Sequence, residues 1–121
     1  MSEEIGSLIR WAHDVAEHDY QAAENFLSLT SHVAEAASVA KELRKMKVTT
    51  RRANDILRAA GLAPLPLTDP GVMRDLKKVL AGDTLSPVLM SYGVIVDGYH
   101  RVSLAYALDP FADVPLKLNS F

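Results

Sequence analysis

The stretch VIVDGYHRVSLAYAL, residues 94–108, decides the fold that this sequence predicts. Its first three residues are β-branched and typical of a buried strand, and Gly98 then interrupts that strand. From Val102 onward the residues are apolar nearly all round, as expected of a helix that is buried on most sides. The stretch therefore predicts a strand, a glycine turn and a buried helix that begins at Tyr99 and ends at Leu108.

The start of this predicted helix is a candidate anion site. The amides of a first helical turn have no intrahelical acceptor, and the helix dipole places its positive end there. Gly98 would let a ligand approach the backbone closely, while His100 and Arg101 could add a hydrogen-bond donor and a positive fork suited to phosphate. In the structural alternative, Arg101 pairs with a nearby carboxylate and His100 is a satisfied structural histidine.

Asp97 stands directly before the predicted turn. A carboxylate beside a phosphate repels it unless the side chain caps the helix or a divalent cation intervenes. We expect capping to be its role. The alternative is that Asp97 helps to hold magnesium between the protein and the phosphates.

The segments around this stretch predict a small sheet. Residues 88–90 and 94–96 read as buried strands, and the three residues between them have the length of a hairpin connection. Residues 114–118 alternate as a closing strand, in which Pro115 indicates an edge position or a strand start. Asp69 and Pro70 begin a helix that buries a stripe and ends before Gly82; the stripe comprises Val72, Leu76, Val79 and Leu80.

The first half of the chain is predicted to be helical. An apolar three-and-four spacing predicts a helix over residues 5–16, and a second is expected over residues 21–29 with Asp19 as its cap. Ser31 would cap a third helix, whose stripe is Val33, Ala36, Ala37, Ala40 and Leu43. A fourth would begin at Thr49 or Thr50 and end at Gly61, with Ala53, Ile56, Leu57 and Ala60 inward. The prolines in residues 62–67 favour an extended path at a sheet edge, and an internal boundary falls there.

The segments LSPVL (85–89), VIVDGYHRVSLAYAL (94–108) and VPLKL (114–118) resemble the ParB N-terminal and sulfiredoxin superfamily. The resemblance covers about residues 65–118. It implies a small α+β fold with a nucleotide phosphate at the helix start, ATP in sulfiredoxins and CTP in ParB proteins. Carried over, Gly98 would be the turn glycine and His100 with Arg101 the phosphate-contacting pair, so that the candidate ligand site comprises Asp97, Gly98, Tyr99, His100 and Arg101.

Two departures exclude the best-known activities of that superfamily. Sulfiredoxins need a cysteine where this chain has Tyr99, and the chain contains no cysteine at all. The chain ends at Phe121, so we expect no DNA-reading or dimerisation region of a complete partition protein. If the protein is an enzyme, phosphate hydrolysis is the expected class, with Arg101 stabilising charge and His100 moving a proton.

The composition excludes several other classes. A chain of 121 residues with 49% hydrophobic and 23% charged residues predicts one globular domain. No segment has the pattern of a signal peptide or a membrane span, and a cytoplasmic location is the default expectation. The four histidines lack metal-ligand spacing, so no metal site is expected.

Residues 41–52 form a basic stretch within a chain of net charge -2. They contain six basic residues and one acidic residue, Glu42, whereas the rest of the chain contains seven basic and fourteen acidic residues. In a nucleic-acid hypothesis, Lys47, Arg51 and Arg52 would contact phosphates while Asn54 or Arg58 faced bases. The simpler alternative is that these cations meet the negative end of the third helix and otherwise stay in water.

The sequence thus predicts a single α+β domain over residues 1–121, in which residues 1–62 form a layer of about four helices. Residues 63–121 form the ParB- and sulfiredoxin-like sheet with two further helices. The predicted function is binding of a nucleotide or another phosphorylated ligand after Gly98, with ATP or CTP and magnesium as candidate ligands. The alternative is a non-catalytic module for binding protein or nucleic acid, in which the motif is structural.

Overall fold

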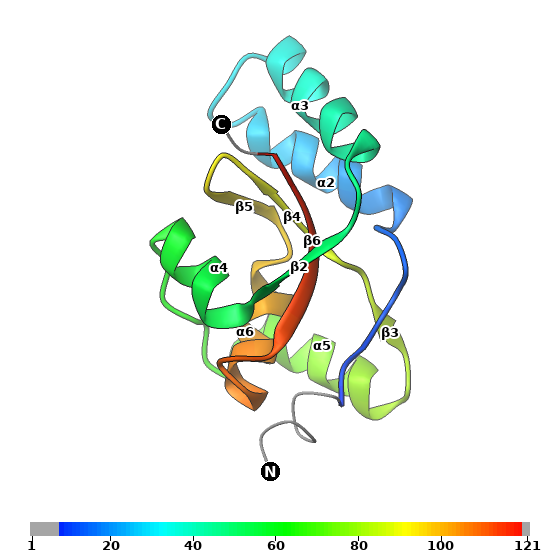
Figure 1. Cartoon of the computed structure of the whole chain (residues 1–121), viewed down its shortest axis with the longest axis vertical. Coiled ribbons are helices and arrows are strands. Elements are labelled where there is room, and N and C mark those ends of the chain that lie inside the picture. The colour runs from blue at the N-terminus through cyan, green and yellow to red at the C-terminus, as the bar shows by residue number, and fades with distance from the viewer. Residues whose placement is uncertain (1–7, 120–121) are drawn as a thin grey trace.

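The computed structural model describes residues 8–119, which fold into an α+β domain (Figure 1). A four-stranded sheet has the order β2-β6-β4-β5, and a separate pair joins β1 to β3. β6 runs parallel to β4 and antiparallel to β2, while β4 and β5 form an antiparallel hairpin. In chain order the elements are β1 (Arg10–Trp11), α2 (Glu17–Leu27), α3 (Val33–Lys45), β2 (Thr49–Arg52), α4 (Ala53–Ala60), α5 (Pro70–Leu80), β3 (Thr84–Leu85), β4 (Val88–Ser91), β5 (Val94–Asp97), α6 (Tyr99–Leu108) and β6 (Asp113–Asn119).

Helices cover both faces of the four-stranded sheet (Figure 1). A cluster of buried hydrophobic side chains lies on each face of the sheet. Because successive side chains of a strand point to opposite faces, β4 contributes Val88 and Met90 to one cluster and Leu89 to the other. α2 and α3 pack over Leu89 and Val96, whereas α4, α5 and α6 pack over the opposite face. Burial on both faces explains why β4 is apolar without alternation, as predicted for a buried strand.

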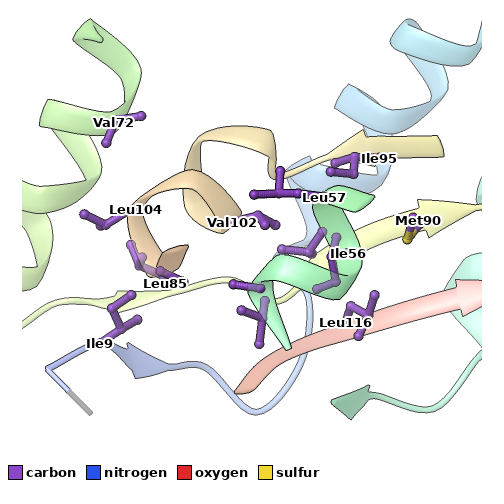
Figure 2. Close-up of a cluster of buried hydrophobic side chains, with 14 of the residues drawn as sticks. Ile9, Ile56, Leu57, Val72, Leu85, Met90, Ile95, Val102, Leu104 and Leu116 are labelled. Carbon is purple, nitrogen blue, oxygen red and sulfur yellow. The ribbon is translucent and has the colours of Figure 1, made fainter. Parts of the chain in front are cut away.

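The larger of the two clusters joins α4, α5 and α6 to the sheet. Figure 2 shows side chains of all three helices, among them Val72, Leu57 and Val102, gathered in one region together with Met90 and Leu116 of the strands. Val72, Val102 and Leu116 are fully buried. α6 therefore lies inside the fold, as predicted from its apolar composition, and its start is held in a fixed position.

The hairpin between β4 and β5 turns at two residues. Ser91 pairs with Val94, so the loop consists of Tyr92 and Gly93. Their φ angles are +47° and +82°, the pair of positive values that a type I′ turn requires. The predicted hairpin is confirmed, with a loop one residue shorter than expected.

Pro115 does not lie at a sheet edge, contrary to one of the two positions predicted for it. β6 is an inner strand, and Pro115 is paired with Thr50 of β2. The pairing of β6 with β4 begins only at Leu116, which is opposite Val88. Pro115 thus occupies a position where β6 has a neighbour on one side only, so a missing amide is tolerated.

The predicted helix over residues 5–16 is wrong for its described part; residues 5–7 lie outside the described residues. Arg10 and Trp11 instead pair in parallel with Thr84 and Leu85, and the Ala12 amide donates to the Leu85 carbonyl at 2.8 Å. A short helix with this apolar spacing is only marginally stable by itself in water, so pairing with a distant strand is the more stable arrangement for these residues. Ile9 and Val15, on either side of this strand, are buried without a helix.

The next two helices form with shifted boundaries. α2 begins at Glu17, so Asp19 is not its cap but a buried residue of its first turn. α3 follows His32 and has no side-chain cap, contrary to the role predicted for Ser31. Its buried face is narrower than predicted: Ala36, Ala40 and Leu43 are buried, whereas Val33 and Ala37 are exposed.

Residues 49–52 form a strand rather than the start of a helix. β2 pairs along its length with β6, and α4 begins only at Ala53. α4 ends as predicted at Gly61, whose φ is +67°. This helix lies on the face of the sheet opposite α2 and α3, so the predicted layer of about four N-terminal helices is divided between two faces. Residues 62–67 form no strand, contrary to the predicted extended edge.

Two strand pairs join the predicted halves of the chain. β1 pairs with β3, and β2 pairs with β6, so each pair crosses the division at residues 62 and 63. The sheet of the second half is therefore completed by a strand from the first.

Lys117 is a buried cation that sequence reasoning did not select. It lies on the face of β6 that α2 and α3 cover, and it is only 4% exposed. Its Nζ donates to the Tyr20 hydroxyl at 2.7 Å and to the Arg44 carbonyl at 3.0 Å, and it lies 3.1 Å from Asp14 Oδ1. Burial opposes the charge, but the partners Tyr20 and Asp14 outweigh it and hold the pKa of Lys117 above its ordinary value. The ammonium thereby ties β6 to α2 and α3.

The cap predicted for α5 is confirmed. Asp69 Oδ2 accepts from the amides of Gly71 at 2.9 Å and Val72 at 3.1 Å, and Pro70 occupies the first turn. Val72 and Val79 are buried as predicted, but Leu80 is 73% exposed and does not belong to the buried face.

Replacing Asp69 by alanine should lower the free energy of unfolding by about 1 kcal/mol, because two first-turn amides lose their acceptor. Asp83→Ala is the matched control, since Asp83 is an exposed carboxylate between α5 and β3. Urea denaturation of both variants measures the difference. Equal stability of the two variants would contradict the capping role.

Candidate functional site

The turn between β5 and α6 requires a glycine for two reasons. Gly98 has φ +109°, a conformation that L side chains rarely adopt. A Cβ placed on it would lie 2.9 Å from Val88 Cγ2 and 3.0 Å from Arg101 Nη2. Gly98 is also the N-cap of α6 and supplies no side-chain acceptor to the first turn. The first-turn amides of α6 are therefore not capped by the residue that begins the helix.

Arg101 is held by acceptors from three separate segments. Its Nη2 lies 2.8 Å from Asp97 Oδ2, 3.2 Å from the Pro87 carbonyl and 3.4 Å from Asp19 Oδ2. Its side chain is 15% exposed, and the side chains of Asp97 and Asp19 are 16% and 6% exposed. The carboxylate pairing that we gave as the structural alternative for Arg101 is thus present, and it joins α2, β5 and α6.

Asp97 does not cap α6, contrary to expectation. Its carboxylate accepts from Arg101 instead, and α6 has no side-chain cap. Burial raises the pKa of Asp97, the nearby Asp19 carboxylate raises it further, and the Arg101 guanidinium works in the opposite direction. Asp97 is therefore a partly buried acid that depends on Arg101 for its charge compensation.

His100 lies against the start of α5. A Cβ added to Gly71 would come within 2.3 Å of His100 Cδ2, so the imidazole covers the backbone of that glycine. His100 Nε2 is 3.5 Å from Asp69 Oδ2, and the side chain remains 52% exposed. The neighbouring Tyr99 donates its hydroxyl proton to the Ala63 carbonyl. His100 is consequently placed where the starts of α5 and α6 approach each other.

A groove of about 510 Å³ opens beside this turn. Four of the five predicted site residues line it, namely Asp97, Gly98, Tyr99 and His100. Its other walls are largely apolar and include Phe26, Leu62 and Val94, each of which is partly exposed. Arg101 is not among the lining residues, so the structure separates it from the other four.

Arg101 instead lines a smaller cavity of about 190 Å³ on another side of the turn. Asp19 and Ser86 also line that cavity, and the Ser86 hydroxyl accepts from the Ala16 amide at 3.0 Å. Arg101 Nε is buried there without a hydrogen-bond partner among the described residues. Sequence reasoning missed Asp19 as a partner of Arg101, because the two residues are far apart in the chain and Asp19 had the spacing of a helix cap.

The groove does not fit the magnesium alternative. Among the described residues, Asp97 is the only carboxylate that lines it, and the Oδ2 atom of that residue accepts from Arg101. Among residues 8–119 there is also no group of three histidine, aspartate or glutamate side chains placed to hold a metal ion. Magnesium usually needs several oxygen ligands, including those of a bound phosphate.

The basic residues predicted to contact nucleic acid lie on an edge strand and beside it. Arg51 and Arg52 belong to β2, and Lys47 precedes that strand. Arg51 Nη1 donates to the Thr50 carbonyl at 2.8 Å, and the Arg52 guanidinium lies 5.9 Å from the centre of the Phe111 ring. The helix that was expected to present these residues therefore does not exist at this position.

No described helix has the length and apolar character needed to cross a membrane. No protein-family model matches the chain, and no significant match was found among curated proteins or solved structures.

Proposed function

We propose that this protein binds a phosphorylated ligand, such as a nucleotide, at the start of α6. The observation that carries the proposal is the uncapped first turn of α6 beside the groove that Asp97, Gly98, Tyr99 and His100 line. Uncapped amides at the positive end of a helix dipole favour an anion. Half-exposed His100 supplies a further donor next to them.

The walls of the groove suit the remainder of a nucleotide. Phe26 is 41% exposed and Leu62 is 40% exposed, and both line the groove with the β5 residues. Bases stack on aromatic side chains and pack on apolar ones without requiring a particular sequence of hydrogen bonds. A phosphate at Gly98 and a base on Phe26 would thus occupy the same groove. The expected kinship with ParB N-terminal and sulfiredoxin domains is part of this proposal and rests on the sequence segments quoted above.

In this proposal Arg101 is a positioning residue. Its Nη2 already contacts two carboxylates and a backbone carbonyl, so it fixes the turn instead of contacting phosphate. Charge stabilisation by Arg101 in a phosphoryl-transfer step would require breaking this buried network. Binding without catalysis is accordingly the function that we propose.

The same network favours the second candidate function, a non-catalytic interaction module. If Gly98, Tyr99 and Arg101 serve only the fold, through the tight turn, the Ala63 contact and the ion pairs, the motif is structural. That candidate predicts no binding of phosphorylated ligands in the groove.

Calorimetric titration with ATP, CTP and GTP, each with and without magnesium, separates the two candidates. We expect at least one nucleotide to bind, and we expect His100→Ala to weaken it about tenfold, the effect of losing a hydrogen bond to a charged group. Gly71→Ala should act similarly, because its methyl group displaces the His100 imidazole. His13→Ala is the matched control, since His13 is exposed and does not line the groove.

Absence of binding heat and of any rise in melting temperature with all three nucleotides would reject the proposal. Binding that His100→Ala and His13→Ala leave equally unchanged would also reject it, because the ligand would then lie elsewhere.

A further inference from the structure

We propose that a pocket between α4 and the four-stranded sheet binds a free amino acid with an apolar side chain. The pocket has a volume of about 320 Å³. Among the described residues it shares none of its lining with the groove at α6, so this inference is independent of the proposed function. A volume of a few hundred cubic ångströms is usual for a small-molecule site.

The interior of the pocket is apolar. It is lined by Ile56 of α4, by Met90 of β4, and by Leu116 and Leu118 of β6. Figure 2 shows the Ile56 side chain near Met90 and Leu116, on the face of the sheet that α4 covers. An apolar ligand group placed here would continue the larger hydrophobic cluster and would be withdrawn from water.

Two small residues stand at the mouth of the pocket. Ala59 is exposed on α4, and Gly93 is exposed in the hairpin turn between β4 and β5. A Cβ added to Gly93 would lie 3.8 Å from the Ala59 carbonyl oxygen, so the helix and the turn approach each other at this point. A larger side chain on Ala59 would therefore occupy space that a ligand needs.

Arg51 supplies a cation to the rim of the pocket. It is paired with Val114 of the larger cluster, so its side chain is on the face that α4 covers. Its Nη1 atom donates to Thr49 Oγ1 at 3.2 Å and to the Thr50 carbonyl at 2.8 Å. Within the described part of the chain, no carboxylate lies within ion-pair distance of Arg51.

Asp55 supplies a carboxylate to the same rim. Its side chain is 54% exposed, and its partner Arg58, at 3.9 Å, is 80% exposed. An exposed pair of this kind contributes little, so a ligand ammonium can compete for the carboxylate.

These three features together specify a zwitterion with an apolar tail. A ligand carboxylate would bind the planar fork of Arg51, a ligand ammonium would bind Asp55, and the apolar side chain would enter the pocket. A ligand with only one of these charges would be repelled by the rim residue of like sign. Because a zwitterion has no net charge, the whole-chain charge of -2 does not oppose its binding.

Nuclear magnetic resonance titration with four related compounds tests the inference. Leucine carries all three groups, whereas isocaproate lacks the ammonium, isoamylamine lacks the carboxylate, and glycine lacks the side chain. We expect leucine to shift the Met90 methyl and Gly93 amide signals, since both residues line the pocket. Its dissociation constant should be at least about tenfold lower than that of each of the other three compounds.

Three variants assign the contacts. Ala59→Leu should abolish leucine binding by filling the pocket, whereas Ala34→Leu, the matched control at an exposed position of α3, should not change it. Arg51→Gln should lower the affinity for leucine to that of isoamylamine for the wild type. Asp55→Asn should lower it to that of isocaproate.

Three results would overturn the inference. Isocaproate or isoamylamine binding as tightly as leucine would show that one of the two rim charges contributes nothing. Leucine binding that Ala59→Leu and Ala34→Leu leave equally unchanged would place the ligand elsewhere. The absence of any shift with all four compounds at millimolar concentration would reject the pocket as a binding site.

Discussion

Replacing Gly98 by alanine is expected to lower the free energy of unfolding by about 3 kcal/mol. Two costs contribute: a residue with a side chain adopts φ +109° poorly, and the added Cβ lies 2.9 Å from Val88 Cγ2 in the buried core. The Val88 side chain is fully buried, so it has little room to move. Urea denaturation followed by circular dichroism measures the loss.

Gly61→Ala separates the backbone cost from the packing cost. Gly61 also has positive φ, at +67°, but no atom lies within 4 Å of the position of an added Cβ. We expect this variant to lose only about 1 kcal/mol. If both variants lose the same amount, close packing of the turn on β4 does not contribute, and the structural account of Gly98 is wrong.

Replacing Arg101 by methionine is expected to lower the free energy of unfolding by about 4 kcal/mol at neutral pH. The change leaves the buried carboxylates of Asp19 and Asp97 without their shared cation, and breaking a buried pair from one side is costly. The added substitution Asp97→Asn should recover much of this loss, because it removes one of the two stranded charges. Arg58→Met is the control: Arg58 is 80% exposed, and its loss should cost at most about 0.5 kcal/mol.

The pH dependence of Arg101→Met has a defined sign. Burial already raises the pKa of Asp97 in the folded protein, and removing the guanidinium raises it further. When the pKa of an acid is higher in the folded state than in the unfolded state, the protein loses stability as pH rises from the unfolded-state pKa to the folded-state pKa. The deficit of the variant relative to the wild type should therefore be smallest near pH 4 and largest near pH 7. A deficit independent of pH would contradict the role of the two carboxylates.

The parts of the fold that the sequence predicted well are those with strong local signals. Asp69 caps the first turn of α5, and Pro70 fits that turn because its missing amide hydrogen is not needed there. Gly61 ends α4 because it adopts the left-handed conformation, with positive φ. The hairpin after β4 and the buried helix after Gly98 likewise follow from turn chemistry and apolar composition. Such features need no knowledge of distant residues.

The errors occur where distant partners decide the structure. Residues 10–11 and 49–52 are strands only because Thr84, Leu85 and β6 offer them a ladder, and nothing in their own spacing indicates it. At these positions the residues therefore form strands with partners distant in the sequence, although their apolar spacing predicted helices.

The candidate site shows the same division between local and distant information. The sequence correctly indicated that Gly98 begins a helix and that His100 remains near its start. It could not indicate that Asp19, 82 positions away, would share Arg101 with Asp97. Nor could it show that the Lys117 ammonium would be enclosed by Tyr20, Asp14 and the Arg44 carbonyl.

Nuclear magnetic resonance titration of the isotopically labelled protein with a nucleotide tests the central claim most directly. The claim is that an anion binds the first-turn amides of α6 while Arg101 remains within its ion-pair network. We predict that the amide signals of Gly98, Tyr99 and His100 shift together with saturation, and that the Arg101 side-chain signal changes little. Shifts confined to Arg51, Arg52 and Lys47, or the absence of any shift at millimolar nucleotide, would contradict the account.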